Sequence, residues 1–338
     1  MVVLVTVNVQ VWPGSFVGPA ARPVRKWVTL TRPASSATTS RLVLIATACS
    51  SGSLAIATAA EMILAGEADV MLCGGADSLS RMTWGGFHSL LLVDAQGCRP
   101  FDATRGGMSF GEGAAMLVLE SEESARRRGA KILARLTGWG ASCDAHHATA
   151  PHPEGAGAAS AIRTALRRAG LEAPAIDYVN AHGTATRDND LAESKALKAV
   201  FGERVPPVSS TKGFFGHALA ASGAIEAVVC VEALRHQELP PNPGFTTLDP
   251  AIGITPVTTL RPAPLAHVMS NSFGFGGNNA VLIFSRPDAP VLTRPPQPGP
   301  ARWWWRKRLA KRSRASAKGQ AANRPAGKTD RPDRKSVV

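Results

Sequence analysis

The sequence predicts an α/β protein, and three observations support this fold class. Apolar runs of strand length alternate with segments whose small and apolar residues recur at helical spacing. Of the 338 residues, 44% are hydrophobic and 32 are glycine, which fits a chain with many tight turns. A chain of this length can also bury a sizeable core. Alternating strands and helices predict a largely parallel sheet that helices cover on both faces.

The predicted elements begin at residue 42. The apolar run 42–48 is predicted to be a strand, the small-residue segment after it a helix, and the run 70–76 a buried strand. Further strands are predicted in AAMLVLE and KILARLTGWGAS. A second series follows in the order helix AASAIRTALRRAG, strand IDYVNA, helix NDLAESKALKAVFG, strand PPVSS, helix AASGAIEAVVCVEALRH and closing strands HVMSNSF and NAVLIF. This order divides the folded part into segments 42–145 and 146–286.

The two ends of the chain differ from this regular pattern. Residues 1–41 match no periodic template and are interpreted as a poorly specified segment, whereas residues 287–338 are Pro-rich and then basic, which is typical of a disordered tail. The formal net charge is +13, but residues 301–338 account for +11 of it, so residues 1–300 are nearly neutral. The charge therefore indicates no specific nucleic-acid partner for the body of the protein.

The tail itself leaves two interpretations open. It contains three consecutive tryptophans followed by basic residues, at 303–308. Aromatic and basic side chains in this arrangement suit RNA or an anionic membrane surface. A solvated appendage without a dedicated partner has the same composition.

Cysteine usage indicates the compartment. The five cysteines are scattered and include no CxxC pair, which argues for a reducing compartment and against a disulfide framework or a structural zinc site. No apolar run is long enough to cross a bilayer, and the first residues lack the pattern of a signal peptide. We therefore expect a cytoplasmic protein without a transmembrane segment and without a bound metal.

Four reactive side chains lie where predicted strands give way to loops or helices. Cys49 lies in TACSSG, His182 in VNAHGTAT, and Lys212 and His217 in SSTKGFFGHALAASG. Because ligand sites of open α/β sheets form at the carboxyl ends of strands, these side chains are expected to converge. Cys49 precedes a predicted helix, whose N-terminal partial charge favours the thiolate. Taken singly, each residue also fits an ordinary structural role.

The glycine-rich turn GFGGN joins the two closing strands. A phosphate-binding loop would need a helix after it, and none is predicted there. Gly274 and Gly276 instead suit a tight turn that brings a backbone N–H close to Cys49. That amide and the amide of Cys49 would together form an oxyanion hole.

Charged residues are expected to support these segments. Asp190 and Glu193 lie three apart on one predicted helix face and suit an ion pair with a lysine. In the loop RPFDATRGGMSFGEG, three charged residues suit structural salt bridges that shape the rim of the site, namely Asp102, Arg105 and Glu112. None of these three is assigned a role in the chemistry.

Five motifs in order resemble a known family. They are TACSSGSLAI, RPFDATRGGMSFGEGAAMLVLE, YVNAHGTATRDNDLAE, SSTKGFFGHALAASGAIEA and NSFGFGGNNAVLIF. Together they resemble the β-ketoacyl-acyl-carrier-protein synthases of the elongating, type II kind, in the thiolase superfamily. The resemblance implies a thiolase-like fold, which is a duplicated αβαβα layered sandwich of two similar halves. It also implies a homodimer, or a heterodimer with a related synthase subunit.

The resemblance implies the chemistry as well. Cys49 would take an acyl chain from the phosphopantetheine arm of acyl carrier protein, and His182 and His217 would promote the decarboxylation of malonyl carrier protein. The resulting carbanion would attack the Cys49 thioester in a Claisen condensation, in fatty-acid or polyketide-like synthesis. A covalent thioester predicts ping-pong kinetics. No bound cofactor is implied.

Further residues take supporting roles by the same resemblance. Lys212 would hold the electrostatics of the site together with Glu193, with Asp190 on the same helix face. The amides of Cys49 and Phe275 would form the oxyanion hole, and the Phe275 ring would gate the acyl pocket. Initiating synthases carry Cys-His-Asn and degradative thiolases carry a second reactive cysteine, so the Cys-His-His set indicates an elongating enzyme.

The sequence departs from this family before the nucleophile. Family members have a much longer N-terminal region than the 48 residues found here, so the N-terminal half is expected to be incomplete and to leave an apolar sheet edge. We therefore hypothesise a truncated or frame-shifted synthase. Two alternatives to an active enzyme are a catalytically silent remnant or partner subunit, and a binding protein that acts through its basic tail.

Overall fold

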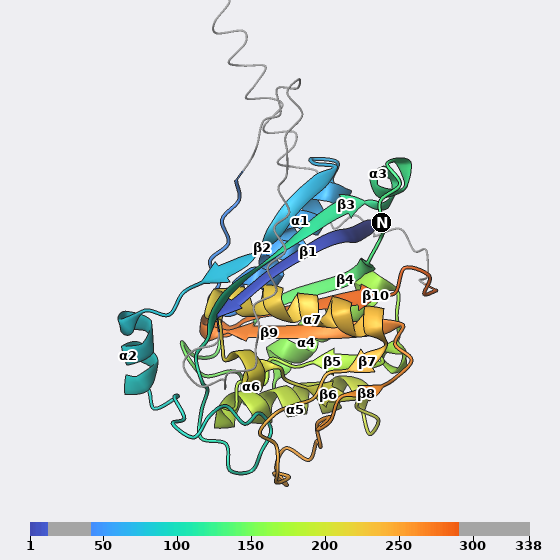
Figure 1. Ribbon diagram of the computed structural model, residues 1–338. Helices are drawn as coiled ribbons and strands as arrows, with labels where there is room; N and C mark the ends of the chain where they lie inside the picture. The colour runs from blue at the N-terminus through green and yellow to red at the C-terminus, as the bar shows by residue number, and fades with distance from the viewer. Residues whose placement is uncertain (13–41, 291–338) are drawn as a thin grey trace, which may run out of the picture. The chain divides into compact units, whose positions relative to one another are not determined.

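An eight-stranded sheet of order β2-β3-β1-β4-β10-β9-β5-β6 forms the centre of the protein (Figure 1). The computed structural model describes residues 1–12 and 42–290, and the side chains of residues 1–4 and 42–290. The strands of the main sheet are β1 Val2–Trp12, β2 Val70–Asp77, β3 Glu112–Ser121, β4 Ala134–Cys143, β5 Tyr178–Asn180, β6 Val208–Ser209, β9 His267–Gly274 and β10 Asn278–Ser285. A second sheet pairs β7 Glu238–Leu239 with β8 Arg261–Pro262.

Alanine is frequent in the longest helices. Their bounds are α1 Ser51–Leu64, α2 Arg81–Ser89, α3 Glu122–Arg127, α4 Ala156–Ala169, α5 Arg187–Phe201, α6 Lys212–Phe215 and α7 Ser222–His236, with 3₁₀ turns at Ala173–Ala175, Leu219–Ala221 and Phe275–Gly277. Alanine, which has the highest helix propensity, recurs through α1, α4 and α7. The hydroxyls of Ser80 and Ser121 cap the N-termini of α2 and α3, and Gly170 ends α4 in the left-handed conformation.

The main sheet is mixed, and the prediction of a largely parallel sheet is wrong. In the described part of the chain, only β5 pairs in parallel, with β6 on one side and β9 on the other. The pairings among β2, β3, β1, β4, β10 and β9 are antiparallel. The sequence pattern did not separate the two arrangements because antiparallel strands that are buried on both faces are as continuously apolar as parallel ones.

Two helix layers contact the two faces of the sheet, as β10 shows. Leu282 and Phe284 belong to the same hydrophobic cluster as the buried residues of α1 and α7. Val281 and Ile283, which alternate with them, belong to the cluster that contains the buried residues of α4 and α5. The period of two along a strand therefore separates the two cores. Helices α1 and α7 also contact each other.

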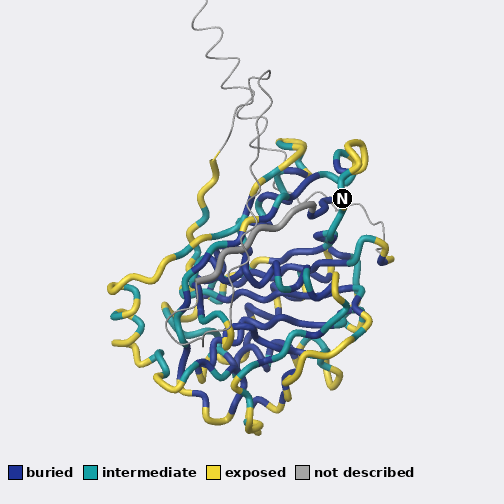
Figure 2. The backbone as a smooth tube through the Cα atoms, in the orientation of Figure 1, coloured by how far each residue is buried: buried dark blue, intermediate teal, exposed yellow. Residues whose placement is uncertain are grey.

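The face of the main sheet that packs against α4 and α5 is covered only in part. On β3, Ala115 and Leu117 are buried against the α1 and α7 side. The opposite side of β2 and β3 carries apolar residues that remain exposed, with Val70 at 50% and Leu72 at 52% of full exposure. Within the described residues, the predicted cover on both faces is therefore present over β4, β10, β9 and β5 and absent over β2. Figure 2 shows the contrast between buried strands and exposed margins.

Strand β1 lies inside the sheet, between β3 and β4. It lies in the segment 1–41, for which the sequence predicts no definite element. It pairs antiparallel with β3 from Val2 to Trp12 and with β4 from Val2 to Leu4. Val3 and Leu4 are completely buried. Residues of the N-terminal segment therefore occupy a position inside the sheet.

The strand predicted at 42–48 does not form. Residues 42–46 have no regular secondary structure, and Leu42 and Leu44 are 94% and 87% exposed. An apolar run of this length satisfies the pattern of a buried strand, but no neighbouring strand of the described chain pairs with it. The predicted disordered tail lies outside the described residues except for 287–290.

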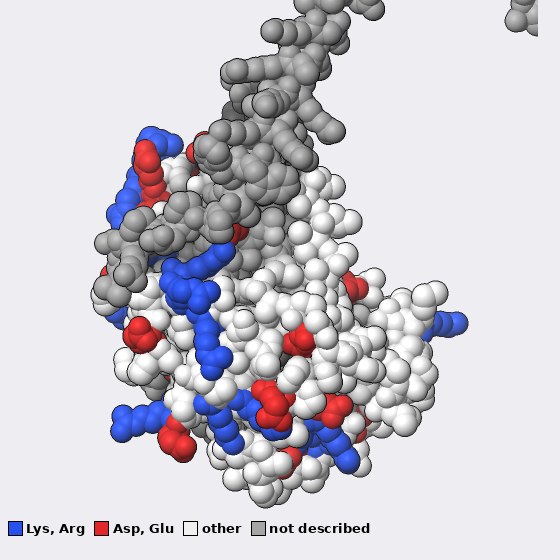
Figure 3. Space-filling view, turned by 180° about the vertical axis from the view of Figure 1, so that it is seen from behind, with Lys and Arg blue, Asp and Glu red and all other residues white. Residues whose placement is uncertain are grey.

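The surface of the described residues carries charges of both signs. In the view from behind, Lys and Arg side chains are interspersed with Asp and Glu (Figure 3). No helix among the described residues is long and apolar enough to span a membrane.

Candidate active site

Cys49 lies in a sharp turn that leads into α1. Ala48, just before it, has a φ of +51°, and Ser50 is the N-cap of the helix. The hydroxyl of Ser51 accepts a hydrogen bond from the Thr47 amide and donates one to the Ala48 carbonyl. These short-range hydrogen bonds define the turn. The thiol is thereby placed next to the helix N-terminus, as the sequence predicts, and is 4% exposed.

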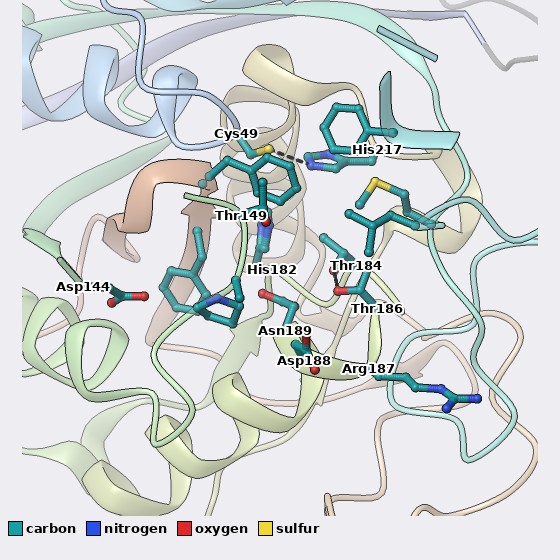
Figure 4. A pocket seen from close by; sticks show the side chains of 18 of the residues that line it. Cys49, Asp144, Thr149, His182, Thr184, Thr186, Arg187, Asp188, Asn189 and His217 are labelled. Carbon is teal, nitrogen blue, oxygen red and sulfur yellow. Dashed lines mark hydrogen bonds between the residues drawn. The ribbon is translucent and has the colours of Figure 1, made fainter. Parts of the chain in front are cut away.

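His217 is the direct partner of Cys49. Its Nε2 lies 3.0 Å from the Cys49 Sγ (Figure 4). Its Nδ1 lies 2.8 Å from the Ser222 Oγ. Backbone hydrogen bonds to Ser109 and Gly111 on the neighbouring segment hold the His217 main chain in place. The expected contact between these two predicted residues is present, although 168 positions separate them.

His182 completes the predicted Cys-His-His set. Its ring centroid lies 5.4 Å from that of His217, in an edge-to-face arrangement. The buried Lys212 ammonium donates a hydrogen bond to the His182 carbonyl at 2.6 Å and lies 3.4 Å from its Nδ1. A lysine ammonium can only donate, so Nδ1 must accept, and the ring hydrogen of neutral His182 resides on Nε2.

The acidic partner of Lys212 is Glu226, and the predicted pairing with Glu193 is wrong. Lys212 Nζ and Glu226 Oε1 form a completely buried ion pair between α6 and α7. Sequence reasoning missed Glu226. The available signal was an acidic residue among the alanines and valines of AASGAIEAVVCVEALRH, on a face that must pack against the sheet.

Glu193 instead holds the loop that carries His182. Its carboxylate accepts hydrogen bonds from the amides of His182 and Gly183, at 2.9 and 2.8 Å, and from the Asn271 side chain at 3.0 Å. A buried carboxylate with three donors is stabilised without a lysine. Burial still raises its pKa above the usual range, against the effect of these hydrogen bonds.

Asp190 has a similar structural role. It accepts hydrogen bonds from the amides of Phe101 and Ala185, and Arg105 Nε lies 3.7 Å from its carboxylate. Its expected ion pair therefore involves an arginine of the rim and not a lysine. Arg105 also pairs with Asp249 at 2.5 Å, as expected for a rim salt bridge.

The other two charged residues expected at the rim form hydrogen bonds in place of salt bridges. Asp102 accepts from the amides of three threonines on two loops, and these hydrogen bonds hold its pKa well below the ordinary value although burial opposes them. Glu112 accepts a hydrogen bond from the Leu79 amide at 3.1 Å. The prediction of salt bridges is thus confirmed for Arg105 and wrong for Asp102 and Glu112 within the described residues.

The glycine-rich turn lies directly against the nucleophile. A Cβ on Gly274 would approach the Thr47 carbonyl oxygen to 2.8 Å and the Cys49 amide nitrogen to 3.1 Å. Gly276 has a φ of +78°, which favours glycine. The Phe275 ring stacks on Phe87, with centroids 5.2 Å apart. The turn therefore brings the Phe275 amide close enough to the sulfur to lower the pKa of the Cys49 thiol, against the larger effect of burial, which raises it.

The electrostatics of Cys49 differ from the expectation. Burial raises the pKa of the thiol to about 11 and outweighs the lowering by Lys212 and by the amides of Phe275 and Cys49. Burial, followed by Lys212, lowers the pKa values of His182 and His217 well below their ordinary value. The resting site therefore holds a neutral thiol and two neutral imidazoles, and the prediction of a thiolate favoured by the helix is wrong for this state.

These side chains open into a cavity of about 520 Å³. Cys49, His182 and His217 line this cavity, and Figure 4 shows five further lining residues, Thr184, Thr186, Arg187, Asp188 and Asn189. Sequence reasoning named none of these five as site residues, although they follow His182 directly in the motif HGTATRDN. No cluster of His, Cys, Asp and Glu that could hold a metal occurs in residues 1–12 and 42–290.

Comparison with known proteins identifies the family. Residues 39–125 match "Beta-ketoacyl synthase, N-terminal domain", and residues 133–246 match "Beta-ketoacyl synthase, C-terminal domain". The chain is 42% identical over 248 residues to 3-oxoacyl-[acyl-carrier-protein] synthase 2 of Mycobacterium tuberculosis, an alignment that covers 71% of this chain and 60% of that protein.

Solved structures agree with this match. The ishigamide ketosynthase/chain length factor superposes with a TM-score of 0.69 at 41% identity, over 71% of this chain and 59% of that chain. The structure named AntDE:AntF, a type II PKS acyl-carrier protein in complex with its ketosynthase, superposes with a TM-score of 0.71 at 33% identity, over 73% and 64%.

The fold and the site define a thiolase-like protein, and the predicted fold class is confirmed. More narrowly, the chain belongs to the β-ketoacyl synthase family. It spans about 60% of the length of the curated relatives that it matches.

Proposed function

We propose that this protein is a condensing enzyme that elongates an acyl thioester by decarboxylative Claisen condensation with malonyl-acyl carrier protein. The observation that carries the proposal is the contact of 3.0 Å between the Cys49 sulfur and His217, with His182 facing the same cavity. The pathway is fatty-acid or polyketide-like synthesis. The proposed compartment is the cytoplasm, which the scattered cysteines support.

In the first half-reaction, the Cys49 sulfur attacks the carbonyl carbon of an acyl group on the phosphopantetheine arm of the carrier protein. The new carbon–sulfur bond replaces the bond to pantetheine, whose thiol leaves with the proton that the Cys49 thiol loses. In this proposal, the amides of Cys49 and Phe275 stabilise the oxyanion of the tetrahedral intermediate. Stacking of the Phe275 ring on Phe87 supports a role for this ring as a gate to the acyl pocket.

In the second half-reaction, malonyl carrier protein loses carbon dioxide as the bond to its carboxyl group breaks. The electron pair forms an enolate, whose oxygen accepts hydrogen bonds from His182 and His217. The enolate carbon then attacks the carbonyl carbon of the Cys49 thioester, and the carbon–sulfur bond breaks to release the elongated β-ketoacyl carrier protein. The electron pair of that bond stays on the sulfur as a thiolate, which takes up a proton from water to restore the thiol. Lys212, neutralised by Glu226, positions His182 for this step.

The proposed partners are acyl carrier protein and a second synthase subunit, either a copy of this chain or a related one. The exposed apolar residues Leu42, Leu44, Val70 and Leu72 support a subunit partner. The same exposure favours the second candidate function, a catalytically silent partner subunit. Binding through the basic tail stays a hypothesis, because the tail lies outside the described residues.

Intact-protein mass spectrometry tests the proposal. The full chain is incubated with acyl carrier protein that bears a medium-chain acyl group, beside the Cys49→Ala variant. We expect an acyl adduct on the wild-type chain that is absent from the variant. Folded wild-type protein that acquires no adduct would rule out the enzyme proposal and leave the silent partner subunit.

A further inference from the structure

The two nitrogens of the His217 ring contact different groups. Nε2 lies 3.0 Å from the Cys49 sulfur, and Nδ1 lies 2.8 Å from the Ser222 hydroxyl. A neutral imidazole carries one ring hydrogen, so one of these nitrogens donates and the other accepts. The partner of Nδ1 therefore decides what Nε2 presents to the cavity.

The surroundings of Ser222 determine the direction of its hydrogen bond. Ser222 is the first residue of α7 and is 4% exposed. Its backbone amide donates to the Leu219 carbonyl. Among the described residues, the hydroxyl has a hydrogen-bond contact with His217 alone. A buried hydroxyl hydrogen without an acceptor is costly, and the Nδ1 lone pair is the acceptor within reach.

We propose that Ser222 is a positioning residue that donates to Nδ1 of His217 and thereby holds this histidine as the Nε2–H tautomer. His217 then acts as a hydrogen-bond donor in the cavity and not as a base for the thiol. The consequence for catalysis rests on the proposed function, because the Nε2–H group is the donor that the enolate oxygen requires.

His182 is held as the same Nε2–H tautomer, but by a lysine in place of a serine. There, the Lys212 ammonium is the group next to Nδ1, at 3.4 Å. Both imidazoles consequently present an N–H group to the cavity, one directed by an ammonium and the other by a hydroxyl. Burial and Lys212 lower the pKa values of both histidines, so both rings are neutral. The position of the single ring hydrogen then decides which nitrogen of each ring donates a hydrogen bond.

Nitrogen-15 NMR of the full chain with labelled histidine reads the tautomer directly. Two-bond correlations show which ring nitrogen carries the hydrogen, and the His217→Asn variant assigns the signals. We expect His217 to be Nε2–H in the wild type and in Ser222→Thr, which keeps the hydroxyl. In Ser222→Ala, the Nδ1–H form should appear. An Nδ1–H form in the wild type, or an unchanged tautomer in Ser222→Ala, would refute the proposal.

Ser53→Ala is the matched control, because it also removes a buried hydroxyl beside the site. The Ser53 hydroxyl contacts that of Ser272 at 2.8 Å and no histidine, so the His217 tautomer should not change. A tautomer change in Ser53→Ala equal to that in Ser222→Ala would show a general packing effect and overturn the assignment to Ser222.

The decarboxylation rate of malonyl carrier protein supplies the catalytic readout. We expect Ser222→Ala to lower it roughly 10-fold, less than the 10²–10³ typical for loss of a whole oxyanion donor. Ser222→Thr should restore most of the rate. An unchanged decarboxylation rate in Ser222→Ala would contradict the proposed effect of Ser222 on catalysis. A wild type that decarboxylates nothing but shows the expected tautomers would refute the proposed function and leave the role of Ser222 intact.

Discussion

Cys49 and the groups around it show how burial and partners set the chemistry of single side chains. A helix N-terminus and a nearby ammonium both favour the thiolate. Complete burial opposes them, and the net effect raises the pKa of the thiol to about 11. The sequence places the helix and the cysteine together, but only packing tells how little water reaches the sulfur.

This balance predicts how the Cys49 thiol reacts with iodoacetamide. Because only the thiolate reacts, the alkylation rate should rise by nearly tenfold for each pH unit from 7 to 9.5 and should show no plateau. Mass spectrometry of the alkylated peptide measures the rate, and the Cys49→Ser variant identifies that peptide. A plateau below pH 9 would show that the helix and Lys212 dominate over burial.

At the scale of elements, the site depends on the close approach of α1 and α7. An added Cβ on Gly52 of α1 would approach Ala224 N of α7 to 2.8 Å and Ala220 O, in the 3₁₀ turn before α7, to 2.9 Å. Backbone atoms cannot rotate away as side chains can. Helix α1, which follows Cys49, and helix α7, which follows His217, can therefore approach this closely because residue 52 has no side chain.

The Gly52→Ala substitution should separate these helices. We expect a loss of roughly 1–3 kcal/mol in the free energy of unfolding, which is typical of overpacking, together with weaker acylation of Cys49. Urea denaturation and the acyl-adduct assay measure the two effects. Gly85→Ala is the control, since no atom lies within 4 Å of the added Cβ, and it should stabilise α2 by up to about 1 kcal/mol. Equal stability of the two variants would contradict the packing argument.

At the scale of the whole molecule, β1 pairs with two strands that lie far from it in the chain, β3 and β4. In the order of strands, β1 lies between β3 and β4. Leu4 is completely buried there, whereas Leu42, the same residue type, is 94% exposed. The contribution of β1 to stability can therefore be measured with one pair of identical substitutions.

We expect Leu4→Ala to lower the free energy of unfolding by roughly 2–5 kcal/mol, because it leaves a cavity in the core. Leu42→Ala should change it by no more than about 0.5 kcal/mol. Chemical denaturation followed by circular dichroism compares the two variants with the wild type. If Leu4→Ala were as stable as Leu42→Ala, β1 would not be part of the cooperative core.

Several local features of the site could be predicted because they depend on short stretches. The helix after Cys49, the glycines against Cys49 and the Cys-His-His set lie within motifs of a few residues. Non-local pairings could not be predicted in the same way. The partner of Lys212 is Glu226 and not Glu193, and nothing in the spacing of the two carboxylates distinguishes them.

The sequence by itself determined the family, the α/β class and three residues that meet in the cavity, Cys49, His182 and His217, because ordered motifs specify chemistry locally. The tertiary structure alone decided the antiparallel pairing of most strands, the insertion of β1 between β3 and β4, and the exposure of residues 42–46. An apolar run indicates that a segment can be buried. Which neighbour buries it depends on contacts between residues far apart in the chain, and these contacts exist only in the folded protein.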